Sequence, residues 1–72
     1  MIPKQSQRKS APGRVPTPAQ IRAARTAAGL TQTEAGAIIY SSLRAWQNWE
    51  AGVRHMHPQL WESWQAKILL LP

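Results

Sequence analysis

The 72-residue chain has no cysteine, no aspartate, no phenylalanine and only three glutamates. Without cysteine, no disulfide can hold a small core together, and nothing points to an oxidising compartment. The few carboxylates and two histidines are too few for a metal site, and no nucleophile–base–acid set can be assembled from the polar residues. We therefore expect no metal, no cofactor and no enzymatic activity. Association with a second copy remains as a way to support a thin core.

Long hydrophobic runs are absent as well. The longest run, Ile68–Leu71, is far shorter than the roughly 20 residues that a membrane-spanning helix needs. Lys4, near the start, is not followed by the apolar stretch of a targeting signal. No segment alternates apolar and polar residues with period two over a useful length, so we expect no sheet. The sequence therefore predicts an all-α protein that does not enter a membrane and lies in the cytoplasm.

Positive charge, by contrast, is abundant: nine lysines and arginines give a formal net charge of +6. Such an excess is typical of proteins that bind a polyanion, although a merely basic surface has the same composition. Residues 1–16 are rich in proline and polar residues and hold too few apolar side chains to fold. We interpret them as a flexible basic arm, whose candidate contacts to the polyanion are Lys4, Arg8, Lys9 and Arg14.

Four helices are expected in residues 17–72, and each has its own start signal. The segments Thr17–Gln20 and Thr31–Glu34 have the spacing of capping boxes, and Ser42 is a good N-cap. Pro58 suits the first position of the last helix. Gly52 closes the third helix. Short connections between these helices predict a single small bundle.

The segment SSLRAWQNWEAG, residues 41–52, mixes large apolar residues with amides. On a helix of about 100° per residue, Trp46 and Trp49 fall on one face, and Arg44, Gln47 and Asn48 fall on the opposite one. The tryptophans can therefore pack against the rest of the domain while the polar face binds a partner.

The residues LTQTEAGAIIYSSLRAWQNWEAG, from Leu30 to Gly52, resemble the helix-turn-helix unit of the lambda repressor and Cro family, also called the XRE type. The likeness includes the initial Leu-Thr-Gln, the small residue at 36, the apolar pair at 38 and 39, and the final Trp-Glu-x-Gly. The stretch RAWQNWEAG, followed by a basic residue and a proline, is similar to the anti-CRISPR-associated regulators, which repress their own operons. The resemblance implies a four-helix domain, or five helices with the tail, whose helix-turn-helix unit spans about residues 31–52, in a bacterial or phage-encoded protein.

The resemblance also implies double-stranded DNA as the partner, in the form of a palindromic operator bound by a homodimeric repressor. Arg44, Gln47 and Asn48 would read bases, and Leu43 would touch a thymine methyl. Backbone contacts would come from Gln32, Ser42, Arg54, His55 and Arg22. The alternative for these polar residues is an ordinary solvated surface, and for Leu43 the edge of the core.

Arg25 and Glu50 match a pair that forms an internal salt bridge in this family. Both lie toward apolar stripes, where an unpaired charge would be costly. The expected core consists of Ile21, Leu30, Ile38, Trp46, Trp49, Leu60 and Trp64. The dimer surface is left open between Trp61, the fourth helix and the Ile68–Leu71 tail.

Some residues depart from the family pattern or need a particular environment. Tyr40 stands in the turn where glycine is usual, and a positive φ at a tyrosine would cost about 1–2 kcal/mol, which favours another turn geometry. Ser41 follows it, where an apolar residue is usual. Gly36 is expected to lie where another helix crosses closely. Two other functions stay open: an antitoxin-like module that sequesters a partner, and RNA binding through the same face.

Overall fold

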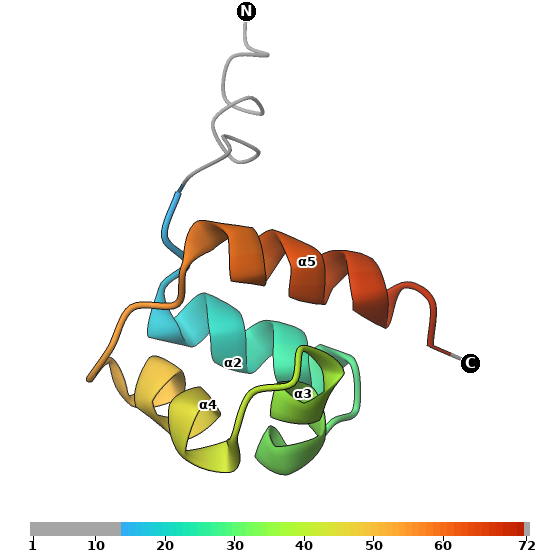
Figure 1. The fold of residues 1–72 in the computed structure, drawn as a ribbon, viewed down its shortest axis with the longest axis horizontal. Coiled ribbons are helices and arrows are strands. Elements are labelled where there is room, and N and C mark those ends of the chain that lie inside the picture. The colour runs from blue at the N-terminus through green and yellow to red at the C-terminus, as the bar shows by residue number, and fades with distance from the viewer. Residues whose placement is uncertain (1–13, 72) are drawn as a thin grey trace, which may run out of the picture.

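The computed structural model describes residues 14–71, and over these residues the chain forms four helices and no strand (Figure 1). The helices are α2 (Pro18–Ala27), α3 (Gln32–Ile38), α4 (Leu43–Ala51) and α5 (Pro58–Ile68). The predicted all-α class is confirmed for this part of the chain. Most of the predicted basic arm, with Lys4, Arg8 and Lys9, lies outside the described residues; Arg14 lies within them and is exposed.

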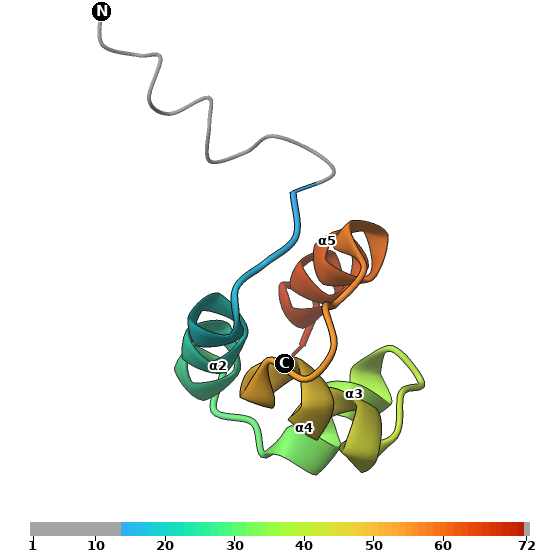
Figure 2. The same cartoon turned by 90° about the vertical axis from the view of Figure 1, so that its left-hand side faces the viewer.

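The four helices pack around a small shared interior. Helix α4 contacts both α3 and α2, and α3 also contacts α5. In Figure 1, α5 runs along the upper edge of the bundle, and α3 and α4 occupy the lower edge. Figure 2, at right angles, shows α2 and α5 on opposite sides above α4. Within residues 14–71, no helix is both long and apolar enough to cross a membrane.

The predicted N-caps are all present. The Thr17 hydroxyl accepts a hydrogen bond from the Gln20 backbone N–H at 3.1 Å, and the Gln20 side chain accepts from the Thr17 N–H at 2.9 Å. Thr31 and Glu34 form the same two bonds at 3.1 and 2.9 Å. The Ser42 hydroxyl accepts from the backbone three residues on at 3.1 Å. These local bonds fix where α2, α3 and α4 begin.

The helix ends also follow the sequence closely. Gly29 and Gly52 take left-handed φ angles of 74° and 79°, a conformation that glycine adopts without steric cost. Helix α2 ends at Ala27, and Ala28 is its C-cap. Pro58 opens α5, as predicted.

The turn between α3 and α4 does not follow the prediction. Tyr40 has a φ of 59°, so the expectation of a different turn geometry is wrong. The Tyr40 N–H donates to the Ala37 carbonyl at 3.1 Å, and the Ser41 N–H donates to the Gly36 carbonyl at 2.8 Å. These backbone bonds hold the turn in the left-handed form. Tyr40 is 93% exposed, so its large side chain does not have to be accommodated inside the domain.

Gly36 lies where this turn folds back against α3. A Cβ atom at this position would stand 2.9 Å from the Ser41 carbonyl oxygen and 3.3 Å from that of Ser42. The close neighbour is therefore the backbone of the turn rather than a crossing helix, which corrects the expectation. Only glycine leaves enough room for this approach.

Tryptophan dominates the core. Trp46 and Trp64 are fully buried, with ring centroids 5.3 Å apart, and Trp46 and Trp49 form a T-shaped pair with ring centroids 5.5 Å apart. The Trp64 indole N–H donates to the Ala35 carbonyl at 3.0 Å, which ties α5 to α3. Ile21 is also buried, and Leu30 and Ile38 pack against the core as partly buried residues.

The prediction that Leu60 belongs to the core is wrong, since its side chain is 37% exposed. The inner face of α5 is taken by Trp64 and by Trp61, which stacks on Trp64 at 5.8 Å, so Leu60 is left at the rim. Met56, in the loop before α5, is fully buried and was not predicted. Trp61 is half-buried and packs against the core.

Candidate nucleic-acid interface

Helix α4 separates its side chains onto two faces. Trp46 and Trp49 are buried, whereas Arg44 and Gln47 are exposed and Asn48 is half-buried. Leu43, in the first turn, is 40% exposed. We call Leu43, Arg44, Gln47 and Asn48 the front of α4. This front offers a guanidinium group, two amides and an apolar side chain next to one another.

The opposite side of α4 is anchored by a buried carboxylate. Glu50 accepts two hydrogen bonds from Arg25 of α2, at 2.6 Å from Nε and 3.1 Å from Nη2. It also accepts from the Trp46 indole N–H at 2.6 Å and from the Gln32 amide at 3.1 Å. The Arg25–Glu50 pair is thus present, and it is the centre of a network that joins α2, α3 and α4.

This network keeps Glu50 ionised although its side chain is only 1% exposed. Burial alone would raise the pKa of Glu50, but hydrogen bonds from Arg25, Trp46 and Gln32, together with the charge of Arg25, lower it from 4.5 to about 2. The hydrogen bond to Glu50 also raises the pKa of Arg25. Arg25 further donates to the Leu30 carbonyl at 3.0 Å, which ties down the α2–α3 connection.

The direction of Glu50 matters for the charge of α4. Glu50 is the one acidic residue of this helix, and it faces inward, where Arg25 neutralises it. The front of α4 therefore carries the charge of Arg44 with no carboxylate beside it on the same helix. Such a surface attracts an anion and places hydrogen-bonding groups next to the charge.

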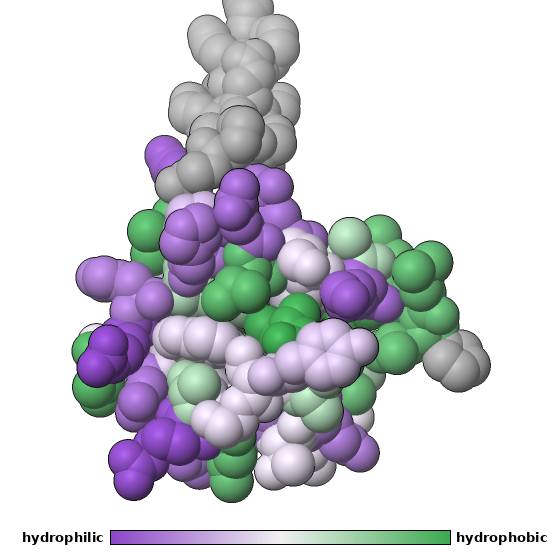
Figure 3. All heavy atoms as spheres, in the orientation of Figure 1, coloured by the Kyte–Doolittle hydropathy of each residue, from purple (hydrophilic) through white to green (hydrophobic). Residues whose placement is uncertain are grey.

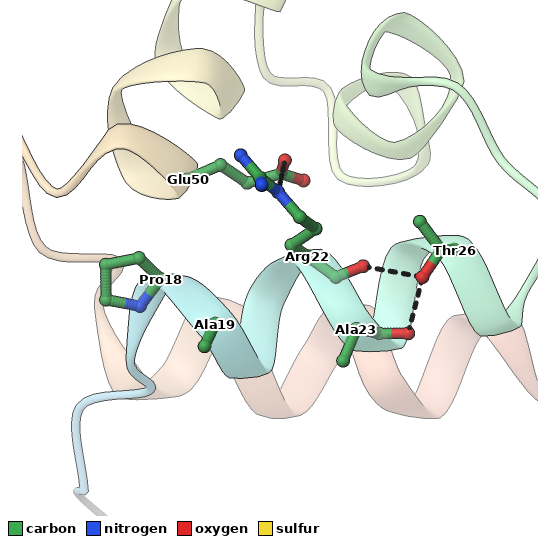
Figure 4. Close-up of a pocket in the computed structure, with 6 residues that line it drawn as sticks. All are labelled: Pro18, Ala19, Arg22, Ala23, Thr26 and Glu50. Carbon is green, nitrogen blue, oxygen red and sulfur yellow. Dashed lines mark hydrogen bonds and ion pairs between the residues drawn. The ribbon is translucent and has the colours of Figure 1, made fainter.

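Arg22 of α2 lies at the rim of this network, beside an open hollow (Figure 4). The hollow is lined by Pro18, Ala19, Arg22, Ala23, Thr26 and Glu50. Arg22 Nε stands 3.5 Å from Glu50 Oε1, and its side chain is 64% exposed. This long contact leaves the Arg22 guanidinium accessible, unlike that of Arg25, and places it beside the last turn of α4.

The other predicted backbone contacts fall into two groups. Arg54 and His55 are exposed in the loop after α4, and Ser42 is exposed at the start of α4. Gln32 is instead half-buried, and both ends of its amide have partners. Its Nε2 donates to Glu50, and its Oε1 lies 3.5 Å from Nε2 of Gln47. The structure therefore brings together Gln32, to which the resemblance assigned a backbone contact, and Gln47, to which it assigned base reading.

Sequence reasoning missed what holds the loop of residues 52–57 in place. Met56 is fully buried between the exposed His55 and His57. His57 caps α5, because its Nδ1 accepts from the Gln59 N–H at 3.0 Å. The run VRHMH holds two apolar residues, Val53 and Met56, and the sequence gives no signal that Met56 is the buried one, since Val53 is 68% exposed. In the part of the chain that the structure covers, no three His, Cys, Asp or Glu side chains gather as metal ligands would.

The chain matches no protein-family model, and no match to a curated protein was found.

Proposed function

We propose that the protein is a sequence-specific DNA-binding repressor, in which α3 and α4 form a helix-turn-helix unit and the front of α4 enters the major groove. The observation that carries the proposal is the division of α4 into two faces. Trp46, Trp49 and Glu50 are buried, so the helix is held rigidly, while Arg44 and Gln47 are free to meet a ligand. A rigid helix with an exposed polar N-terminal half suits groove recognition.

The side chains of the front match the chemistry of base edges. Arg44 has the fork of donors that pairs with guanine O6 and N7, and the amides of Gln47 and Asn48 can pair with adenine N6 and N7. Leu43 is the apolar residue placed to touch a thymine methyl. The residues of the front therefore supply both charge and sequence information.

The charge of the chain supports binding to the phosphate backbone. A net charge of +6 attracts DNA and releases its counterions, whatever the sequence of the DNA. Ser42, which precedes the front along the chain, and Arg54 and His55, which follow α4, are all exposed, and Arg22 is accessible beside the last turn of α4. The basic arm of residues 1–16 adds further attraction in this proposal.

Repression at a palindromic operator requires a homodimer whose two α4 helices lie about 34 Å apart. Leu69 and Leu70 are exposed at the C-terminal end, where Figure 3 shows apolar surface. Leu69 also lines a hollow together with Ala24, Ala27 and Ala28 of the α2 side. This surface has no charged lining residue, so two copies of a basic protein can approach at it. The resemblance to anti-CRISPR-associated regulators makes a phage or mobile-element operon, controlled by its own product, the specific form of the proposal.

Selection of bound duplexes from a randomised double-stranded DNA library tests the proposal. The full chain should enrich one motif with inverted symmetry, and fluorescence anisotropy should then measure affinity for it. Arg44→Ala removes a bidentate contact worth about 1–3 kcal/mol from each half-site, so binding of the dimer to the motif should weaken by about 2–6 kcal/mol, which is roughly thirtyfold or more. Gln65→Ala, which alters an exposed glutamine of α5, is the control and should bind as the unaltered chain does.

Three outcomes would contradict the proposal. The first is that no duplex motif is enriched. The second is preferential binding of single-stranded or looped RNA over the selected duplex, which would indicate RNA recognition. The third is an Arg44→Ala variant that binds the motif as tightly as the unaltered chain, which would remove the front of α4 from the interface.

A further inference from the structure

We propose that Gln32 is a positioning residue, which fixes the amide of Gln47 in one orientation and thereby sets the base that Gln47 selects. The inference rests on the proposed function and assigns Gln32 a role other than contact with the DNA backbone. It follows from the chain of hydrogen bonds that runs from buried Glu50 through Gln32 to Gln47.

The first step fixes the amide of Gln32. An ionised carboxylate can only accept hydrogen bonds, and Oε1 of Glu50 lies 3.1 Å from the Gln32 amide. The Gln32 NH₂ group must therefore face Glu50. Turning the amide over would set its carbonyl oxygen against the buried carboxylate and remove a hydrogen bond to a charge. Glu50 is itself held by Arg25 and Trp46, so it provides a fixed reference.

The second step passes this orientation to α4. With its NH₂ group turned inward, Gln32 presents Oε1 to Gln47, whose Nε2 lies 3.5 Å away, near the outer limit of a hydrogen bond. Gln47 is exposed on the front of α4, where an unrestrained amide would turn freely. The carbonyl of Gln32 favours the orientation in which the Gln47 NH₂ group faces α3.

The third step gives the consequence for base selection. After one N–H is given to Gln32, Gln47 keeps one N–H donor and its carbonyl oxygen acceptor, in a fixed order along the groove. Adenine offers an N7 acceptor and an N6 donor in the major groove, whereas guanine offers two acceptors. A fixed Gln47 amide therefore favours adenine at one position of the site, and this preference depends on Gln32.

Two measurements on Gln32→Met test the proposal, because methionine keeps the length of the side chain but has no amide. In the free protein, ¹⁵N relaxation of the Gln47 side-chain NH₂ should report greater mobility in the variant, while the exposed Gln65 stays unchanged. The operator position read by Gln47 is the one at which Gln47→Ala abolishes the preference for adenine. At that position, Gln32→Met should reduce the preference for adenine by about fivefold or more. Combining Gln32→Met with Gln47→Ala should lower this preference no further than Gln47→Ala alone.

Several results would overturn the proposal. The Gln47 amide of the unaltered chain could be as mobile as that of Gln65, a comparison that needs no variant and no DNA. The losses of adenine preference caused by Gln32→Met and by Gln47→Ala could add in the double variant. Gln32→Met could also weaken binding to all duplexes alike and reduce its salt dependence, as loss of a phosphate contact would. If the unaltered chain selects no duplex, the proposed function fails, while the relaxation comparison still decides whether Gln32 positions Gln47.

Discussion

Replacement of Glu50 by glutamine is the sharpest test of how α4 is held. Glutamine keeps the shape of the side chain but removes its charge and places an NH₂ group among donors. The largely buried guanidinium of Arg25 loses its counter-charge, and the Trp46 and Gln32 donors must compete for a single oxygen. The front of α4 remains unaltered in sequence, so the change acts on its support.

The cost can be worked out from the pKa of Glu50. A lowering from 4.5 to about 2 corresponds to about 3 kcal/mol of folding free energy at neutral pH, at about 1.4 kcal/mol per pH unit. Removal of one partner from a buried ion pair typically costs about 3–5 kcal/mol. We expect Glu50→Gln to lose about 3 kcal/mol, which is a large part of the stability of so small a domain.

The dependence on pH has a definite sign. The folded pKa of Glu50 lies below its unfolded value, so its contribution is complete well above pH 4.5 and is lost as the pH falls toward 2. About 2 kcal/mol of this contribution should be gone at about pH 3. The Glu50→Gln variant lacks this group and should show a correspondingly smaller loss on acidification.

Urea unfolding followed by circular dichroism measures both effects, at neutral pH and at about pH 3. Glu62→Gln, which neutralises an exposed glutamate of α5, is the matched control and should stay close to the unaltered chain. A Glu50→Gln variant within about 1 kcal/mol of the unaltered chain at neutral pH would refute the reasoning. Equal acid sensitivity of the two chains would refute it as well. If the variant does not fold, the acid titration of the unaltered chain still tests the size of the effect.

Three further substitutions test the α3–α4 turn by urea or thermal unfolding. Gly36→Ala should lower the free energy of unfolding by about 1–3 kcal/mol, because the new Cβ would stand 2.9 Å from the Ser41 carbonyl oxygen. Helix propensity alone predicts a stabilisation, and a stabilised variant would contradict the close approach. Tyr40→Asn should stabilise by about 1 kcal/mol and raise Tm by roughly 4–8 °C, because asparagine tolerates a φ of 59° better; an unchanged or lower Tm would show that the turn is unstrained. Ser42→Ala should cost about 1 kcal/mol through loss of the N-cap of α4, and equality with an exposed Thr33→Ala control would speak against that cap.

The parts of the fold that depend on neighbouring residues could be predicted from the sequence. The caps at Thr17, Thr31 and Ser42 act within three residues, so they can be predicted without knowledge of the fold. The burial of Trp46 and Trp49 likewise follows from helical spacing within one segment. Trp46 and Glu50 are four residues apart on α4, so their hydrogen bond was also within reach of local reasoning.

The parts that depend on distant contacts could not be predicted. Leu60 and Met56 are both apolar residues near the start of α5, and their sequence neighbours do not indicate that Met56 is buried and Leu60 exposed. The φ of Tyr40 is set by backbone hydrogen bonds to α3, against its own preference. The contact between Gln32 and Gln47 joins residues 15 positions apart, and no local pattern indicates it.

The central claim is that the front of α4 binds DNA while its buried face holds the helix in place. The most direct test is a titration of the ¹⁵N-labelled full chain with the selected duplex, followed by NMR. We predict that signals of residues 42–48 shift most, and that the indole N–H signals of Trp46 and Trp64, which are hydrogen-bonded inside the protein, change little. Shifts confined to α5 and residues 69–71, with α4 unchanged, would contradict the claim.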